Sequence, residues 1–136
     1  MIEGMGHVCI GALDLGETER FYCEALGFRK LFRFLRDGQE IGFYLALPDG
    51  SFVEVFKEDD AKVSPQGLIR HLCLRVDDLD ATIAALGARG IEAVGKKLGA
   101  DRSWQAWIED PSGVRIELHQ YTDESRQQTG GDCVLG

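Results

Sequence analysis

The chain has 136 residues, of which 44% are hydrophobic and 28% are charged, and its formal net charge is −8. This composition is typical of one globular domain, which we expect over residues 1–136. An acidic surface repels phosphate groups, so nucleic acid and anionic membranes are excluded as expected partners. No apolar run reaches the ~20 residues of a membrane-spanning helix, and residues 1–16 lack the pattern of a secretory signal. We therefore expect a cytoplasmic protein that binds a small molecule.

The first half of the chain has the pattern of a strand, a helix and three more strands. Strand-like alternation comes first, followed by a helical apolar face that Gly27 terminates. Turn residues, Asp37-Gly38 and Pro48-Asp49-Gly50, then separate the later strands. The expected elements in chain order are a strand at 6–10, a helix at 17–26 and strands at 30–35, 41–47 and 52–56.

The second half repeats this order after a charged segment without periodicity at 57–67, which we interpret as a linker. The two modules are expected at about 5–56 and about 68–121, and the polar, glycine-rich tail at 122–136 is expected to be mobile. The expected elements of the second module are a strand at 70–76, a helix at 80–89 and strands at 92–97, 104–109 and 115–121.

An internal duplication supports this division. His7 and His71, 64 residues apart, each precede a Cys by two residues and a Leu by eight. Glu54 and Glu117, 63 residues apart, each close the pattern Pro-x-Gly, two residues, an aliphatic residue and Glu. We therefore predict an α+β fold in which two tandem βαβββ modules form a curled mixed sheet around a metal-binding cleft.

Four side chains of the repeated blocks stand out because alternate residues of a strand point to opposite faces. Each of the four strands has a purely aliphatic face, expected to pack on the helix of its module, and an opposite face that carries one His or one Glu. Buried carboxylates are costly unless they are paired or bind a cation. We therefore predict that one divalent metal ion is bound by His7, Glu54, His71 and Glu117.

Two imidazoles and two carboxylates suit the borderline metals Zn, Ni, Co, Fe and Mn. Four protein ligands on a six-coordinate ion leave two positions for water or substrate, which is typical of a catalytic rather than a structural site. The four cysteines lack a metal-binding spacing, so we interpret them as reduced, and Cys9 and Cys73 as small residues buried in their strands.

These motifs resemble the vicinal oxygen chelate superfamily, which includes glyoxalase I, methylmalonyl-CoA epimerase, extradiol dioxygenases, and fosfomycin and bleomycin resistance proteins. The resemblance covers about residues 5–121. It is carried by Gly6-His7-Val8, Phe21-Tyr22-x-x-x-Leu26-Gly27-Phe28, Arg70-His71-Leu72 and Asp110-Pro111-Ser112-Gly113-x-x-Ile116-Glu117-Leu118. The superfamily fold is paired βαβββ units, and glyoxalase I of the bacterial type uses the ligands His, Glu, His and Glu, in the order found here.

The resemblance implies a metal-dependent lyase or isomerase of the glyoxalase type. In such a reaction the metal chelates two oxygens of the substrate and stabilises the enediolate that forms when the adjacent C–H proton leaves. Glu117 is implied as the base that moves this proton, with Glu54 as its partner. The superfamily also implies a homodimer.

Three features of the sequence bear on the substrate. Bacterial glyoxalase I carries an Arg four residues after its first ligand and an Asn four residues after its second, and both help to hold glutathione. Here these positions are Gly11 and Glu58, which argues against a glutathione conjugate as the physiological substrate. Arg75 and Arg115 share strand faces with the ligands of the second module, where a guanidinium can hold an anionic group of the substrate.

Two other functions remain open on the sequence. A metal-free binding protein would sequester a drug or metabolite without turnover, as some resistance proteins do, and elemental analysis of the purified protein separates this case. A non-haem iron dioxygenase would use two His and one Glu, here His7, His71 and Glu117, and would consume oxygen with Fe(II) and a catechol.

Overall fold

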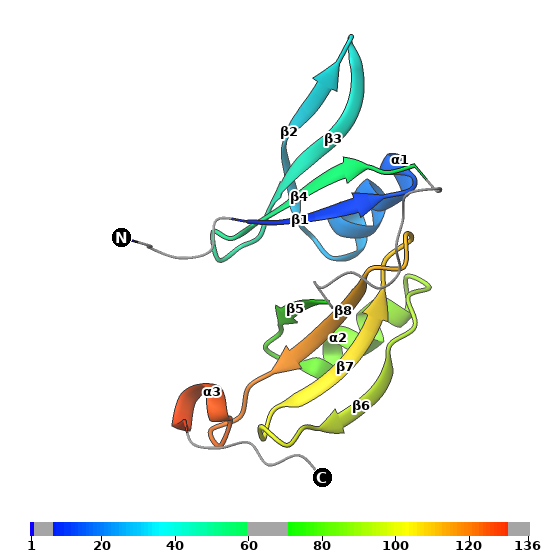
Figure 1. Ribbon diagram of the computed structural model, residues 1–136. Coiled ribbons are helices and arrows are strands. Elements are labelled where there is room, and N and C mark those ends of the chain that lie inside the picture. The colour runs from blue at the N-terminus through cyan, green and yellow to red at the C-terminus, as the bar shows by residue number, and fades with distance from the viewer. Residues whose placement is uncertain (2–6, 60–70, 131–136) are drawn as a thin grey trace. The chain divides into compact units, whose positions relative to one another are not determined.

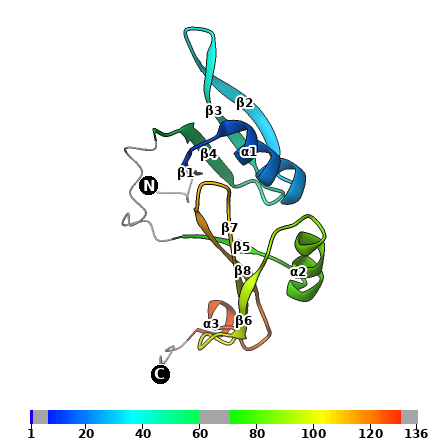
Figure 2. The same cartoon turned by 90° about the vertical axis from the view of Figure 1, so that its right-hand side faces the viewer.

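The computed structural model describes Met1 and residues 7–59 and 71–130. The predictions for Gly6, Arg70, Cys133 and most of the linker therefore lie outside the described residues. The chain divides into two compact units, residues 1–67 with 110–113 and residues 68–109 with 114–136. Each unit is a four-stranded sheet with a helix on one side (Figures 1 and 2).

Unit 1 contains β1 (His7–Ala12), β2 (Arg29–Arg36), β3 (Gln39–Ala46) and β4 (Phe52–Lys57), in the spatial order β1-β4-β3-β2. β1 is parallel to β4, and the other pairs are antiparallel. The β2–β3 hairpin projects beyond the other two strands of its sheet in both views (Figures 1 and 2).

The helix of unit 1 begins earlier than the sequence predicts and changes its geometry midway. α1 (Leu15–Glu19) continues directly into a π-helical segment, η1 (Arg20–Ala25). The Asp14 carboxylate accepts a hydrogen bond from the backbone N–H of Glu17 at 2.8 Å, and this cap fixes the start of the helix. Gly27 has a φ of 77°, which favours glycine, and ends the segment as predicted.

Unit 2 repeats the same topology. It contains β5 (Leu72–Arg75), β6 (Val94–Leu98), β7 (Trp104–Glu109) and β8 (Arg115–Gln120), in the order β5-β8-β7-β6, and β5 is parallel to β8. α2 (Leu79–Gly87) is capped by the Asp78 carboxylate and packs against β7 and β8. The predicted α+β fold of two βαβββ modules, each with a mixed sheet, is therefore confirmed.

The alternation of strand faces is also as predicted. The aliphatic residues of the repeated blocks form the core, whereas each His and Glu lies on the opposite face of its sheet. The buried aliphatic residues of these blocks are Ile10, Val53, Val55, Leu72, Ile116 and Leu118. Burying one such side chain stabilises the fold by about 1.5–3 kcal/mol, so the core fixes the register that presents the opposite faces.

The segment after β8 contains a short helix that the sequence reading did not include. α3 (Arg126–Thr129) follows Ser125, which is fully buried and whose hydroxyl is 2.8 Å from the Ser103 hydroxyl. Across the described parts of the chain, no helix is both long and apolar enough to span a bilayer.

Candidate functional site

In unit 1 the first predicted His and Glu lie together on neighbouring parallel strands. The β1–β4 register sets Cys9 opposite Glu54 and His7 opposite Phe52. His7 Nε2 is 3.7 Å from Glu54 Oε1, and the two side chains are 40% and 19% exposed. The pair therefore remains open to a ligand on the surface of its sheet.

Unit 2 repeats this arrangement with the second His and Glu. The β5–β8 register sets Cys73 opposite Glu117. His71 Nε2 is 3.4 Å from Glu117 Oε2, with side-chain exposures of 36% and 14%. The duplication seen in the sequence thus extends to the geometry, because each unit brings its own His and Glu together.

The spacing within each pair fits two ligands of one cation. Metal bonds to His nitrogen and carboxylate oxygen are about 2.0–2.2 Å long, so two adjacent ligands are separated by roughly 3.0–3.5 Å. The observed distances of 3.7 and 3.4 Å agree with this range to within a few tenths of an ångström. Among the described residues, no cluster of three or more His, Cys, Asp or Glu side chains is gathered to hold a metal. Each unit by itself thus brings together two of the predicted ligands, and the four-ligand centre stays a prediction.

An aromatic residue accompanies each pair. The sequence pointed to neither Tyr44 nor Trp107 as a site residue, and for Trp107 it favoured packing in the core. Tyr44 of β3 lies opposite Glu54, and Trp107 of β7 lies opposite Glu117. Each ring meets the His of its unit edge-on, with ring centroids 5.5 Å apart for Tyr44 and 4.9 Å apart for Trp107. The signal was present in the sequence, because these two residues are 63 positions apart, as the two Glu residues are.

Tyr44 also fixes the imidazole of His7. The Tyr44 hydroxyl is 3.1 Å from His7 Nδ1, while Nε2 faces Glu54. A histidine that binds a metal through Nε2 carries its proton on Nδ1 and donates it to a neighbouring oxygen. The Tyr44 oxygen occupies the position of that acceptor, so the surroundings of His7 fit a metal ligand.

The prediction that Cys9 and Cys73 are buried is wrong, because both residues are exposed free cysteines on the His and Glu faces. Partial loss of water around the sulfur, a hydrogen bond to Glu54 and the charges of Glu54 and Glu58 raise the pKa of Cys9 to about 11. Partial burial, with the charge of Glu117 and a hydrogen bond to it, raises the pKa of Cys73 to about 11 as well. Both thiols thus stay protonated at neutral pH and donate to the carboxylates.

Gly11 and Glu58, the two positions that differ from the glutathione-binding pattern, are adjacent in space. A Cβ atom added to Gly11 would lie 2.5 Å from Glu58 Cγ, so the Glu58 side chain occupies the space that a larger residue at position 11 would need. The backbone N–H of Glu58 also donates to the carbonyl of Ala12 at 2.8 Å. The two differences are therefore coupled, and they replace a cation with a carboxylate near the His7–Glu54 pair.

The two predicted substrate-binding arginines are exposed in unit 2. The Arg115 guanidinium lies over the Trp107 ring, 4.4 Å from its centroid, and therefore borders the His71–Glu117 pair. The Arg75 guanidinium lies 5.8 Å from the centroid of Tyr121, further along the same face.

The third histidine, His119, is not a ligand in the prediction, and the structure gives it another partner. It is buried, and its Nε2 is 3.1 Å from Asp101 Oδ2. That contact is within ion-pair distance, although its angles do not meet those of a hydrogen bond. His119 therefore belongs to a separate contact in unit 2.

The chain is similar in sequence and in fold to several known proteins. The chain is 30% identical over 125 residues to Uncharacterized protein YaeR of Escherichia coli (strain K12), covering 84% of this chain and 93% of that protein. The structure of a glyoxalase family protein from Enterococcus faecalis is 30% identical, with a TM-score of 0.75 over 86% of this chain and 97% of that one. The structure of TnmS3, an antibiotic binding protein from Streptomyces sp. CB03234, is also 30% identical, with a TM-score of 0.71 over 89% and 98% of the two chains.

A family model matches residues 4–118, which include both His–Glu pairs and nearly all of both sheets. With the two βαβββ modules, this match establishes that the chain belongs to the Glyoxalase/Bleomycin resistance protein/Dioxygenase superfamily.

Proposed function

We propose that the protein is a metal-dependent lyase or isomerase of the glyoxalase type, acting on a small substrate that offers two adjacent oxygens. The proposed ligands of one divalent ion, Ni, Co, Zn, Mn or Fe, are His7, Glu54, His71 and Glu117. The observation that carries this proposal is the equivalence of the two His–Glu pairs, which have ligand-like spacing and, in each unit, one aromatic and one cysteine neighbour at matching positions. An ion pair that only stabilises the fold would not need the same spacing and the same kinds of neighbouring residue in both units.

The donor set defines the chemistry that we propose. A bound divalent ion supplies Lewis-acid stabilisation of the negative charge that develops on the substrate oxygens. Glu117 takes the proton from the carbon next to the carbonyl and returns it to the product, with Glu54 as its partner carboxylate. The Cys73 thiol donates to Glu117, which holds that carboxylate in one orientation. Arg115 and Arg75 then hold an anionic group of the substrate.

The proposal is tested first by elemental analysis of protein purified without added metal. We expect one equivalent of metal per chain, and we expect His7→Ala and His71→Ala each to lose most of it. His119→Gln is the matched control, because it removes the remaining histidine of the chain without touching either pair. Retention of full metal content by both alanine variants would refute the proposed ligands.

Catalysis requires a separate test, because a bound metal does not prove turnover. We expect Glu117→Gln to retain metal and to lose more than about a hundredfold in turnover of a 2-oxo substrate, since the amide cannot accept the proton. Full activity of Glu117→Gln would exclude this residue as the base.

We also propose that the protein is a homodimer, and subunit mixing tests whether one site uses ligands of two chains. A mixture of His7→Ala and His71→Ala chains regains sites with four ligands only if each site joins unit 1 of one chain to unit 2 of another. Partial recovery of metal binding indicates shared sites, and no recovery indicates sites within one chain.

A metal-free binding function is the second candidate, and the similarity to the antibiotic binding protein TnmS3 favours it. In that case the protein would bind its ligand with the same affinity before and after chelation of metal. Loss of ligand affinity after chelation, with recovery when metal is restored, would favour the enzyme instead.

A further inference from the structure

The face of unit 1 that carries His7 and Glu54 is lined with aromatic rings. Three neighbouring strands contribute them, and the rings form one continuous set of contacts. Phe32 stacks on Tyr44 with centroids 4.8 Å apart, and Phe34 stacks on Phe56 at 4.6 Å. Phe52 contacts Tyr44 at 5.4 Å and Phe34 contacts Phe32 at 5.3 Å. We call this set the aromatic face; it consists of Phe32, Phe34, Tyr44, Phe52 and Phe56.

A glycine of β3 makes this arrangement possible. Gly42 lies opposite Phe56 on the neighbouring strand, and a Cβ atom at Gly42 would be 2.8 Å from Phe56 Cδ1 and 2.2 Å from the Val55 carbonyl oxygen. Any larger residue at position 42 would displace the Phe56 ring. The missing side chain leaves room for this ring to lie close to β3 and to stack on Phe34.

The aromatic face is continuous with the His7–Glu54 pair. Tyr44 belongs to both, because its ring stacks on Phe32 while its hydroxyl contacts His7. Adjacent strands are about 4.8 Å apart and alternate residues along one strand about 6.6 Å apart, so Phe32 and Phe56 lie within roughly 10 Å of Glu54. A molecule of one or two rings can therefore contact these side chains while its oxygens reach the pair.

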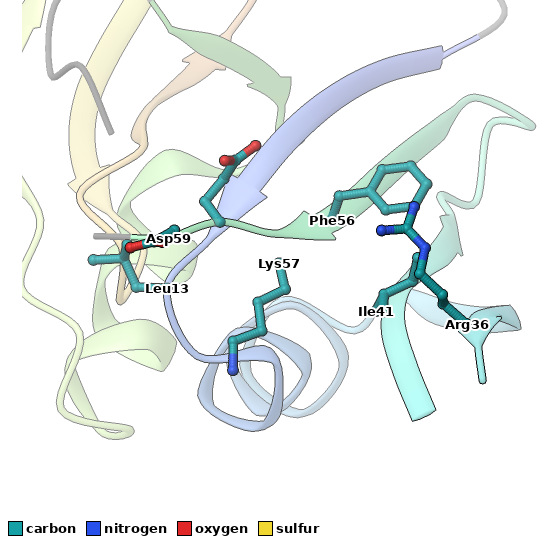
Figure 3. A pocket seen from close by; sticks show the side chains of 7 residues that line it. Leu13, Arg36, Ile41, Phe56, Lys57 and Asp59 are labelled. Carbon is teal, nitrogen blue, oxygen red and sulfur yellow. The ribbon is translucent and has the colours of Figure 1, made fainter. Parts of the chain in front are cut away.

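A pocket of about 650 Å³ extends the aromatic face at its Phe56 end (Figure 3). This volume is in the range of sites that bind small molecules. Figure 3 shows the Arg36 side chain beside the Phe56 ring, and Lys57, Glu58 and Asp59 also line the pocket. The pocket thus combines the Phe56 ring with charged groups of both signs.

The size of the aromatic face favours a small ligand over a protein partner. Phe32 is 48% exposed and the other four rings are half-buried. With about 200 Å² for a whole aromatic side chain, roughly 400 Å² or less remains exposed. A stable protein interface covers about 800 Å² on each partner, so this face alone is too small for one.

We propose that the aromatic face binds the ring of an aromatic substrate whose two adjacent oxygens are directed to the His7–Glu54 pair. This inference rests on the proposed function for the chelation, but the ring recognition depends only on the side chains of unit 1. The substrate class is therefore planar aromatic compounds with vicinal oxygens, such as aryl diketones and aryl 2-oxo acids.

The test compares two neutral diketones that differ only in the ring. Each joins its ring through two adjacent carbonyl groups to a methyl group, and the ring is phenyl in one and cyclohexyl in the other. Binding to the full-length protein is measured by calorimetry with metal and by ligand-detected NMR after chelation. We expect the phenyl compound to bind about threefold to tenfold more tightly, in both conditions, since ring stacking needs no metal.

Phe32→Leu is the decisive variant, because Phe32 is the most exposed ring and its loss disturbs the fold least. We expect this variant to lose the phenyl preference and to keep its metal content. Trp104→Leu is the matched control, since Trp104 is an exposed aromatic residue of unit 2 outside the aromatic face, and we expect it to keep the preference.

The outcomes separate this inference from the proposed function. Equal affinities for the two diketones, an unchanged preference in Phe32→Leu, or no binding of either diketone after chelation would overturn the aromatic site. A phenyl preference that is present although the protein binds no metal would support the aromatic site and refute the metal-dependent activity.

Discussion

Replacing Tyr44 with Phe isolates the contribution of one hydroxyl to the proposed metal site. The variant removes the contact between the Tyr44 hydroxyl and His7 Nδ1, 3.1 Å in length, and leaves the ring in place. The stacking of that ring on Phe32 at 4.8 Å and its contact with Phe52 therefore persist. We expect stability within about 0.5 kcal/mol of the parent protein, because this contact lies at the surface.

The expected effect on metal affinity is larger. Removing the partner of a ligand histidine typically weakens metal binding by about tenfold to a hundredfold. The contact is exposed to water, which can replace the hydroxyl in part, so we expect the lower end, about tenfold or ~1.4 kcal/mol. The reason is that the imidazole of the variant is free to rotate and to change tautomer before it binds.

Competition with a chromophoric chelator measures this change, using Ni or Zn at neutral pH. Tyr121→Phe serves as the matched control, because it removes a tyrosine hydroxyl from unit 2 outside both His–Glu pairs. Equal metal affinity of Tyr44→Phe and the parent protein would refute the role of Tyr44 in orienting His7. An equal loss in both tyrosine variants would refute it as well.

Three further predictions concern the surroundings of the pairs and the core. With the pKa of Cys9 at about 11, roughly 0.1% of its thiol is ionised at about pH 8 in metal-free protein, so alkylation of Cys9 should be slow. The alkylation rate should rise tenfold per pH unit up to about pH 11. At constant pH the rate should be higher in Glu54→Gln, because the nearby negative charge is gone. Gly42→Ala should lower the free energy of unfolding by about 2–4 kcal/mol in urea titrations, because its Cβ would overlap a backbone oxygen; an unchanged midpoint would contradict this. Tyr22→Phe should lower the free energy of unfolding by about 1–3 kcal/mol, because it removes the buried hydrogen bond from the Tyr22 hydroxyl to the Asp110 carboxylate, 3.1 Å in length. Its metal affinity should not change.

The sequence predicted the fold well because the signals are local and repeated. Each strand of the repeated blocks alternates between aliphatic and mixed residues, and this pattern fixes which face is buried. Gly27 marked the end of the first helix correctly. The start of that helix was less clear, because the cap at Asp14 lies outside the apolar pattern that defined residues 17–26.

The residues of the candidate site that recur in both halves of the chain could be predicted from the sequence. The recurrence of His and Glu predicted the two His–Glu pairs that the structure shows, whereas their role as metal ligands stays a prediction. The recurrence of Tyr44 and Trp107 at the same offset could have revealed the aromatic partners of these pairs. The aromatic face was not predictable in this way, because it depends on the register of β2 with β3, which two irregularities shift. The exposure of Cys9 and Cys73 was misjudged because small apolar residues are usually buried, whereas these two share the open faces of the Glu residues.

The two units agree in the pairs and differ in what surrounds them. Next to its pair, unit 1 has phenyl rings stacked on Tyr44, whereas unit 2 has the guanidinium of Arg115 over Trp107. The proposed metal ion would require similar ligand spacing from both units, and this requirement would account for the matching His–Glu pairs. Nothing in metal binding requires the flanking residues to match, so these can serve different parts of a substrate. We therefore expect unit 1 to recognise an aromatic ring and unit 2 an anionic group, and a substrate with both groups to bind more tightly than one with either alone.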